Sequence, residues 1–169
     1  LGDFRCGSTV TVNLGYAAEH VPPRIRGHGY LVPSQEDRPA RACTWSSAKF
    51  AGRAPRGHSL LRVSLGGPGR DVLNGVDHDS LIALARAELE ETMGVTAEPV
   101  LARVHGWHGV MPQYTFGHSA RVAEVERLLA RHPGVVVAGS AFHGVSIPDC
   151  VASAERAARA VLASLDGYL

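Results

Sequence analysis

The residues best suited to chemistry form a glycine-punctuated turn that leads into a predicted helix. Gly139 and Gly144 lie in this turn, and Pro148 and Asp149 begin the helix. Proline is pre-organised for the first helical turn, and an acidic side chain suits the positive end of the helix dipole. Unpaired N–H groups at such an end can hold an anionic or electron-rich ligand atom. The glycine spacing matches neither GxGxxG nor GxxxxGK[ST], so an ordinary strand-to-helix connection stays open as the plainer interpretation.

Metal binding and side-chain catalysis find less support. The sequence has nine histidines, but neither an HExxH motif nor a Cys/His finger pattern. His105 and His108 lie three residues apart, and Gly106 and Gly109 interrupt any helix that would align them. We therefore expect no metal site. No Ser/His/Asp order or carboxylate pair stands out for acid–base work, so we assign no catalytic side chain.

Composition bounds the class of protein. The 169 residues are 45% hydrophobic and 20% charged, which is typical of one soluble globular domain or parts of two. A net charge of +1 without a basic run argues against nucleic-acid binding. No stretch approaches the roughly 20 apolar residues that span a bilayer, so any membrane contact would be peripheral. Three widely spaced cysteines without a CxxC pair favour a reduced compartment, and we expect a cytoplasmic protein.

Hydrophobic patterning predicts an antiparallel sheet in the first hundred or so residues. Residues 9–16 alternate between β-branched or apolar and small or polar side chains. Residues 29–32 and 42–45 flank a polar, proline-bounded loop and predict a hairpin with an exposed tip. Further strands are expected at 60–65 and 99–105. The glycine-rich stretch 66–70 lacks the lysine and hydroxyl of a P-loop and predicts a surface turn.

One helix is expected to cover this sheet. Apolar residues recur at helical spacing over 81–93, with Asp79 or Ser80 as the N-cap and Gly94 at the end. We expect its acidic residues to face solvent; these are Glu88, Glu90 and Glu91.

The C-terminal part has a different pattern. Residues 107–115 predict an irregular aromatic loop, residues 119–130 an amphipathic helix, and the apolar run 135–138 a short buried strand. A helix from Pro148 carries an apolar stripe of Val151, Ala154, Ala158, Val161, Leu162 and Leu165.

Several motifs in order resemble the C-terminal part of the oxygen-dependent protoporphyrinogen/coproporphyrinogen III oxidases, flavoenzymes with an amine-oxidase-like architecture. They are Gly27-His28-Gly29-Tyr30-Leu31-Val32-Pro33, Cys43-Thr44-Trp45-Ser46-Ser47, Trp107, Met111-Pro112-Gln113-Tyr114-Thr115, Gly117-His118 and the segment from Ala138 to Cys150. The resemblance covers nearly the whole chain.

The resemblance implies where ligands bind. The FAD contacts of the family map to Trp107, Val145, Ser146 and Ile147 of this chain. The family's tetrapyrrole cavity maps to His28, Gly29, Leu31 and Ser64, although the family often has phenylalanine where this chain has His28. A helix N-terminus near the pyrimidine edge of the flavin would stabilise the negative charge of the reduced ring.

The resemblance also implies an α+β fold made of parts of two domains. Residues 1–106 would be a partial substrate-binding domain, with an antiparallel sheet and its covering helix. Residues 107–169 would be the strand-turn-helix that closes an FAD-binding α/β domain. The GxGxxG fingerprint for the FAD pyrophosphate is missing from the sequence, and the first residue is Leu1. We therefore expect a partial chain, whose partner is the N-terminal part of the same enzyme and supplies most ADP contacts.

The implied reaction is haem-pathway oxidation of protoporphyrinogen IX or coproporphyrinogen III. Hydride would pass from a porphyrinogen methylene carbon to the flavin, and oxygen would reoxidise the flavin to give hydrogen peroxide. Three such cycles remove six electrons. Two alternatives remain: a non-catalytic tetrapyrrole-binding or assembly module, and a related flavin amine oxidase or carotenoid desaturase.

Overall fold

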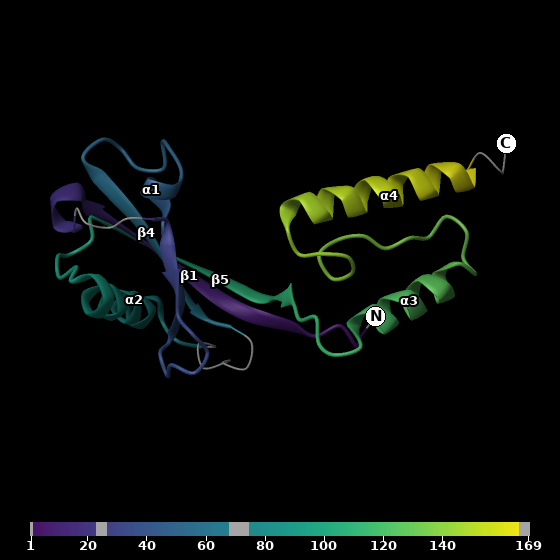
Figure 1. Ribbon diagram of the computed structural model, residues 1–169, viewed down its shortest axis with the longest axis horizontal. Coiled ribbons are helices and arrows are strands. Elements are labelled where there is room, and N and C mark those ends of the chain that lie inside the picture. Colours follow the sequence, from purple (N-terminus) through teal and green to yellow (C-terminus); the bar gives the residue numbers. More distant parts are fainter. Residues whose placement is uncertain (1, 23–26, 68–74, 166–169) are drawn as a thin grey trace. The chain divides into compact units, whose positions relative to one another are not determined.

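The chain contains both strands and helices, and a computed structural model describes residues 2–22, 27–67 and 75–165 (Figure 1). The elements are β1 (Cys6–Ala17), the 3-10 helix η1 (Ala18–His20), β2 (Gly29–Leu31), β3 (Ala40–Trp45), α1 (Ser46–Lys49), β4 (His58–Gly66), α2 (His78–Met93), β5 (Leu101–Pro112), α3 (His118–Leu129) and α4 (Ile147–Leu165). The chain divides into two compact units. We call Gly7–Met111 the sheet unit, and Leu1–Cys6 with Pro112–Leu169 the helical unit.

The sheet unit contains one five-stranded sheet in the order β2-β3-β4-β1-β5. The predicted antiparallel sheet is thus confirmed, and β1 pairs with β4 so that Val12 lies opposite Val63. Successive side chains of a strand point to opposite faces. The buried face carries Val10, Val12, Leu14, Tyr16, Ala40, Cys43, Leu61, Val63 and Leu65, all at most 6% exposed.

Helix α2 covers that face and forms the core with it, as expected (Figure 1). Leu81, Ala85 and Leu89 are at most 2% exposed. The helix begins earlier than expected, because Asp77 rather than Asp79 or Ser80 is the N-cap and accepts a hydrogen bond from the Ser80 N–H. Gly94 ends it in the left-handed conformation that glycine adopts without strain.

The hairpin of β2 and β3 is confirmed, but its loop is not wholly exposed and Glu88 does not face solvent. Arg38 in the loop donates to the Glu88 carboxylate at 3.0 Å, and the Tyr30 hydroxyl donates to the same carboxylate at 2.9 Å. The Glu88 side chain is only 2% exposed. An unpaired carboxylate would not be stable there, so Arg38 and Tyr30 explain the burial.

Strand β5 continues through most of the predicted irregular loop and ends at Pro112. The strand is longer than expected because it pairs with β1. A further bond between the two strands runs from the Gly109 N–H to the Ser8 hydroxyl at 2.9 Å. The chain passes from one unit to the other after Cys6 and again after Met111, and residues 106 and 107, on either side of the expected domain boundary, belong to β5. The assignment of the units to substrate and flavin domains stays a prediction.

The helical unit contains α3 and α4 close to their expected positions. The predicted strand at 135–138 is wrong, since these residues pair with no strand among those that the structure describes. An extended apolar run becomes a strand only when neighbouring backbone groups bond to it. Val135 and Val136 are 52% and 40% exposed as a result.

Two earlier expectations can be compared with the described residues only. Gly66 ends β4, and residues 68–70 of the expected surface turn lie outside the described ranges. Within those ranges, no helix is long and apolar enough to cross a bilayer.

Replacing Arg38 tests the role of the buried ion pair. Arg38→Met should lower the free energy of unfolding, because it leaves the Glu88 carboxylate buried without its cation. Removing the cation from a buried carboxylate is strongly destabilising, because the charge is left uncompensated. Arg127→Met is the matched control, since Arg127 pairs with Glu124 on the surface and both side chains are more than half exposed. Urea denaturation of both variants measures the difference, and equal losses would contradict a special role for Arg38.

Candidate functional site

The face of the sheet opposite α2 gathers most of the predicted residues of the sheet unit. Cross-strand pairing sets Leu31 opposite Ala42, Ala42 opposite Ser64, and Ser64 opposite Thr11. On β5, the neighbour of β1, the Trp107 indole N–H donates to the Thr11 hydroxyl at 3.3 Å. The row crosses all five strands, which at about 4.8 Å per step makes it roughly 19 Å wide. Leu31, Ser64 and Trp107 thus share one surface, which we call the open face.

The middle of the open face carries small side chains, so it forms a depression between the larger side chains of Leu31 and Trp107. Thr11, Ala42, Thr44 and Ser64 are only partly buried, whereas Leu31 is 83% and Trp107 50% exposed. The core that the sheet forms with α2 lies on the opposite face, and the four-residue helix α1 also contacts β3 and β4. A low floor between two larger apolar side chains suits a flat ligand with apolar surface.

A groove of about 310 Å³ lies at the β2 end of the open face. We call it the β2–β3 groove, and its lining is His28, Gly29, Tyr30, Leu31, Ala42, Cys43, Thr44 and Lys49. Three of the four predicted tetrapyrrole contacts therefore lie together, and Ser64 lies beside the groove as the partner of Ala42.

Gly29 keeps the groove open at its edge strand. Its φ is +146°, and a Cβ there would overlap the Cys43 carbonyl oxygen. The backbone approaches β3 so closely that no side chain fits. The neighbouring His28 carbonyl accepts from the Trp45 N–H at 2.9 Å, which fixes the same edge.

The charge around the groove is positive. Lys49 lines the groove. Arg62 on β4 pairs with Thr44 on β3, next to the pair of Ala42 and Ser64. The described groove lining includes no acidic residue, and Arg62 has no ion pair or hydrogen bond with any described residue. Two cations without an acidic partner among the described residues favour a ligand that carries carboxylates.

The thiol of Cys43 and the phenol of Tyr30 point to the buried face rather than into the groove, and both are uncharged at neutral pH. Burial raises the pKa of the Cys43 thiol to about 12, and burial also raises the pKa of Tyr30. A thiol in this state is a poor nucleophile. The groove therefore suits binding rather than covalent chemistry. The described residues also include no cluster of three His, Cys, Asp or Glu side chains that could hold a metal ion.

The predicted flavin contacts Val145, Ser146 and Ile147 lie at the start of α4 in the helical unit. Ser146 and Asp149 cap this helix reciprocally. The Ser146 N–H donates to the Asp149 carboxylate at 3.2 Å, and the Asp149 N–H donates to the Ser146 hydroxyl oxygen at 3.2 Å. The serine hydroxyl also donates to the carboxylate at 2.6 Å. This is a capping box, and it satisfies two of the orphan donors of the helix.

The capping box narrows what the helix start can bind. Pro148 has no N–H, and Ser146 and Asp149 use theirs internally, so the Ile147 N–H is the donor of this first turn that has no partner among the described residues. Ile147 is 82% exposed. One free N–H at the positive end of a helix suits a single carbonyl-type acceptor. Gly144 is needed for this geometry, because a Cβ on it would lie 2.5 Å from the Asp149 Cγ.

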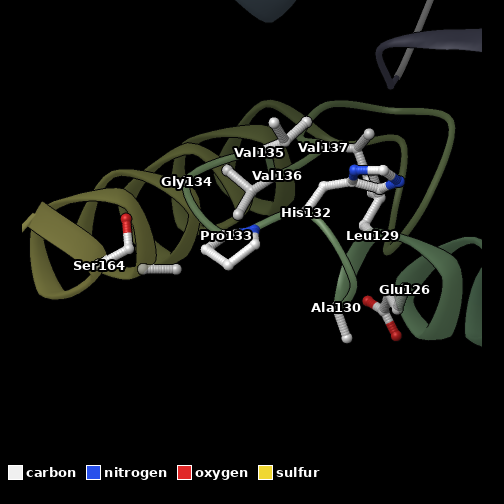
Figure 2. Close-up of a pocket in the computed structure, with 11 residues that line it drawn as sticks. Glu126, Leu129, Ala130, His132, Pro133, Gly134, Val135, Val136, Val137 and Ser164 are labelled. Atoms are coloured by element: carbon white, nitrogen blue, oxygen red, sulfur yellow. The ribbon is translucent and has the colours of Figure 1, made fainter. Parts of the chain in front are cut away.

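A second hollow, of about 370 Å³, lies elsewhere in the helical unit. Figure 2 shows it bounded by the end of α3, the extended residues after His132 and part of α4 near Ser164. It contains none of the predicted contacts and no cluster of charges. We assign it no ligand.

The structure groups the predicted residues into two sets. His28, Gly29, Leu31, Ser64 and Trp107 belong to the sheet unit, and the α4 start belongs to the helical unit. Their meeting around one flavin stays a prediction.

Sequence reasoning missed Thr11, Lys49 and Arg62 as candidates. The alternation of residues 9–16 could have placed Thr11 on the face opposite the core. The partners of Arg62 depend on strand register, and only the structure supplies that.

Comparison with known proteins identifies relatives of this arrangement. A family model described as flavin containing amine oxidoreductase matches residues 2–162. Coproporphyrinogen III oxidase of Bacillus subtilis is 34% identical over 89% of this chain and 32% of its own length. The enzyme of the same name from Propionibacterium freudenreichii is 37% identical over 96% and 30%. Protoporphyrinogen oxidase of Macaca fascicularis is 31% identical over 92% and 33%.

Solved structures give the same result for the fold. A protein from Exiguobacterium sp. 255-15, provisionally described as a protoporphyrinogen oxidase, superposes with a TM-score of 0.79 at 30% identity. The match covers 98% of this chain and 36% of that protein. Reduced UDP-galactopyranose mutase, at 17% identity and a TM-score of 0.62, shares the fold over 77% of this chain. The chain thus spans about a third of the length of the relatives it matches.

The capping box gives a pH test. Hydrogen bonds from the Ser146 hydroxyl and then from the Ser146 N–H lower the pKa of Asp149. The stabilisation of the helix start is therefore present at neutral pH and is lost as the pH falls through this lowered pKa. In Ser146→Ala the pKa of Asp149 should rise, and the first turn of α4 should fray. Carboxyl NMR titration of both proteins checks this, and an unchanged Asp149 midpoint would contradict the capping box.

Proposed function

Because the chain belongs to the flavin containing amine oxidoreductase family, we propose that it is the C-terminal part of an FAD-dependent porphyrinogen oxidase. The observation that carries the proposal is the match of nearly the whole chain to oxidases that act, by their names, on coproporphyrinogen III or protoporphyrinogen. The open face adds support, since it provides a low floor between Leu31 and Trp107.

The residues at the start of α4 fit a flavin. The exposed Ile147 N–H would donate to a carbonyl oxygen of the pyrimidine edge, where reduction adds negative charge. Val145 and Ile147 offer apolar surface to the ring, as both are more than 60% exposed. Bound FAD would accept the electrons that the substrate loses and pass them to oxygen. Trp107 would contribute a flat wall from the sheet unit.

The β2–β3 groove and the open face fit a porphyrinogen. This substrate class combines a broad apolar macrocycle with propionate carboxylates. The macrocycle would lie over the small side chains of Ala42 and Ser64, while Lys49 and Arg62 would attract carboxylates. No ionisable side chain of the groove is assigned a proton-transfer role.

The remaining length of the relatives explains the exposed apolar surface of the helical unit. Residues of α4 at helical spacing share one exposed stripe, and each is more than half exposed: Ile147, Val151, Leu162 and Leu165. Exposed Val135 and Val136 lack a strand partner among the described residues. We assign this surface to contact with the N-terminal part of the same oxidase, which would also supply the grip on the FAD pyrophosphate.

A non-catalytic tetrapyrrole-binding module is the alternative that one observation favours. The groove and the open face lie within the sheet unit alone and need no flavin to form. This candidate predicts porphyrin binding without flavin and without oxidase activity in the complete protein.

Cofactor content separates these functions. The 169-residue chain should purify without stoichiometric FAD, because the pyrophosphate fingerprint is not in its sequence. The protein from the complete coding sequence should carry one FAD and convert porphyrinogen to fluorescent porphyrin while consuming oxygen. Absorption spectra and porphyrin fluorescence measure both. A complete protein that binds porphyrin but no flavin would favour the module, and stoichiometric FAD on the short chain would overturn the assignment of the phosphate grip.

Arg62→Gln tests the carboxylate contact. In the oxidase it should raise KM roughly tenfold with little change in kcat, because one charge-assisted hydrogen bond is lost. The effect should be larger for coproporphyrinogen III, with four propionates, than for protoporphyrinogen IX, with two. Arg86→Gln is the control, since Arg86 lies on α2 and pairs with Glu98. Equal KM values for the two variants would remove Arg62 from the site.

A further inference from the structure

Tyr114 joins two segments of the helical unit that are far apart in the sequence. Its hydroxyl donates to the Ser140 carbonyl at 2.8 Å and accepts from the Gly144 N–H at 2.7 Å. Both partners lie in the turn that leads to α4. The phenol therefore bridges the two ends of the turn and uses its donor and an acceptor site in doing so.

His118 supports this bridge from the first residue of α3. Its ring stacks on the Tyr114 ring with the centroids 3.8 Å apart and the planes 13° from parallel. Its Nε2 donates to the Phe142 carbonyl at 3.2 Å, midway between the two Tyr114 contacts. A carbonyl can only accept, so Nε2 carries the proton in this bond. His118 is 9% exposed, and Phe4 packs edge-on against its ring at 5.6 Å.

Few other bonds hold the turn among the described residues. The Phe142 N–H reaches the Gly139 carbonyl at 3.3 Å, and the Gly139 N–H donates to the Ser153 hydroxyl at 3.1 Å. The His143 ring also reaches out of the turn, with its Nε2 2.8 Å from the Glu126 carboxylate on α3. Tyr114 is thus the partner that binds the backbone N–H of Gly144, while the neighbouring His143 is held through its side chain.

We infer that Tyr114 and His118 are positioning residues, which hold the Gly139–Gly144 turn so that Val145 to Ile147 meet the flavin in a fixed orientation. The inference rests on the proposed function. Neither side chain touches the cofactor in this scheme. Tyr114 is 43% exposed, but both of its hydrogen bonds are made within the chain, so it serves the turn rather than a ligand.

Deleting one oxygen atom tests the inference. Tyr114→Phe keeps the stacked ring and removes both hydroxyl bonds. Tyr16→Phe is the matched control, because the Tyr16 hydroxyl is buried without a hydrogen-bond partner among the described residues. Hydrogen exchange on the 169-residue chain should show the Gly144 amide exchanging roughly tenfold faster in Tyr114→Phe and unchanged in Tyr16→Phe.

The same two variants in the complete oxidase test the link to the cofactor. Tyr114→Phe should raise the Kd for FAD roughly tenfold and shift the flavin reduction potential, whereas Tyr16→Phe should change neither. Slow Gly144 exchange in Tyr114→Phe would overturn the bridge itself. Faster exchange with unchanged FAD affinity and potential would overturn the positioning role. A wild-type protein that binds no flavin would instead refute the proposed function and leave the exchange result intact.

Discussion

Packing of α2 against one face of the sheet is the interaction on which the sheet unit depends. Leu81, Ala85 and Leu89 are almost wholly removed from solvent against residues of β1, β3 and β4. Because side chains alternate along a strand, each residue committed to this core sends its neighbours to the opposite face. The core therefore determines which residues form the open face, and the pairing of Ser64 with Thr11 and Ala42 follows from it.

A buried charge extends this constraint to the edge of the sheet. Glu88 belongs to the covering helix, yet its carboxylate bonds to Tyr30 of β2 and to Arg38 of the hairpin loop. The pair fixes where the shortest strand lies against the helix. Because β2 is held in one register, Gly29 and Leu31 stay at the groove. An interaction on the face covered by α2 thus fixes the positions of residues on the opposite face. Polar contacts inside a core can specify one arrangement in this way at some cost in stability.

Sequence patterns predicted the elements that are determined by residues close together in the sequence. Alternation predicted β1, the proline-bounded loop predicted the hairpin, and Gly94 marked the end of α2. The failures have non-local causes. Glu88 is in an acidic run typical of a solvated surface, and its burial is explained by Arg38 and Tyr30, which lie fifty or more residues earlier. Residues 135–138 have the composition of a strand but lack a partner among the described residues. Family resemblance supplied the site residues, and strand register, which sequence does not reveal, aligned Leu31 with Ser64.

The reciprocal cap of Ser146 and Asp149 has a consequence for the timing of cofactor loading. The two residues satisfy each other, so the first turn of α4 needs no ligand to form. A protein that captures its cofactor on a preformed turn loses little chain entropy at that step. In the proposed flavin site, an incoming carbonyl at Ile147 would compete only with solvent and would break no internal bond. In that scheme the flavin would bind to a turn that has already folded, and the turn would not need the flavin as a template.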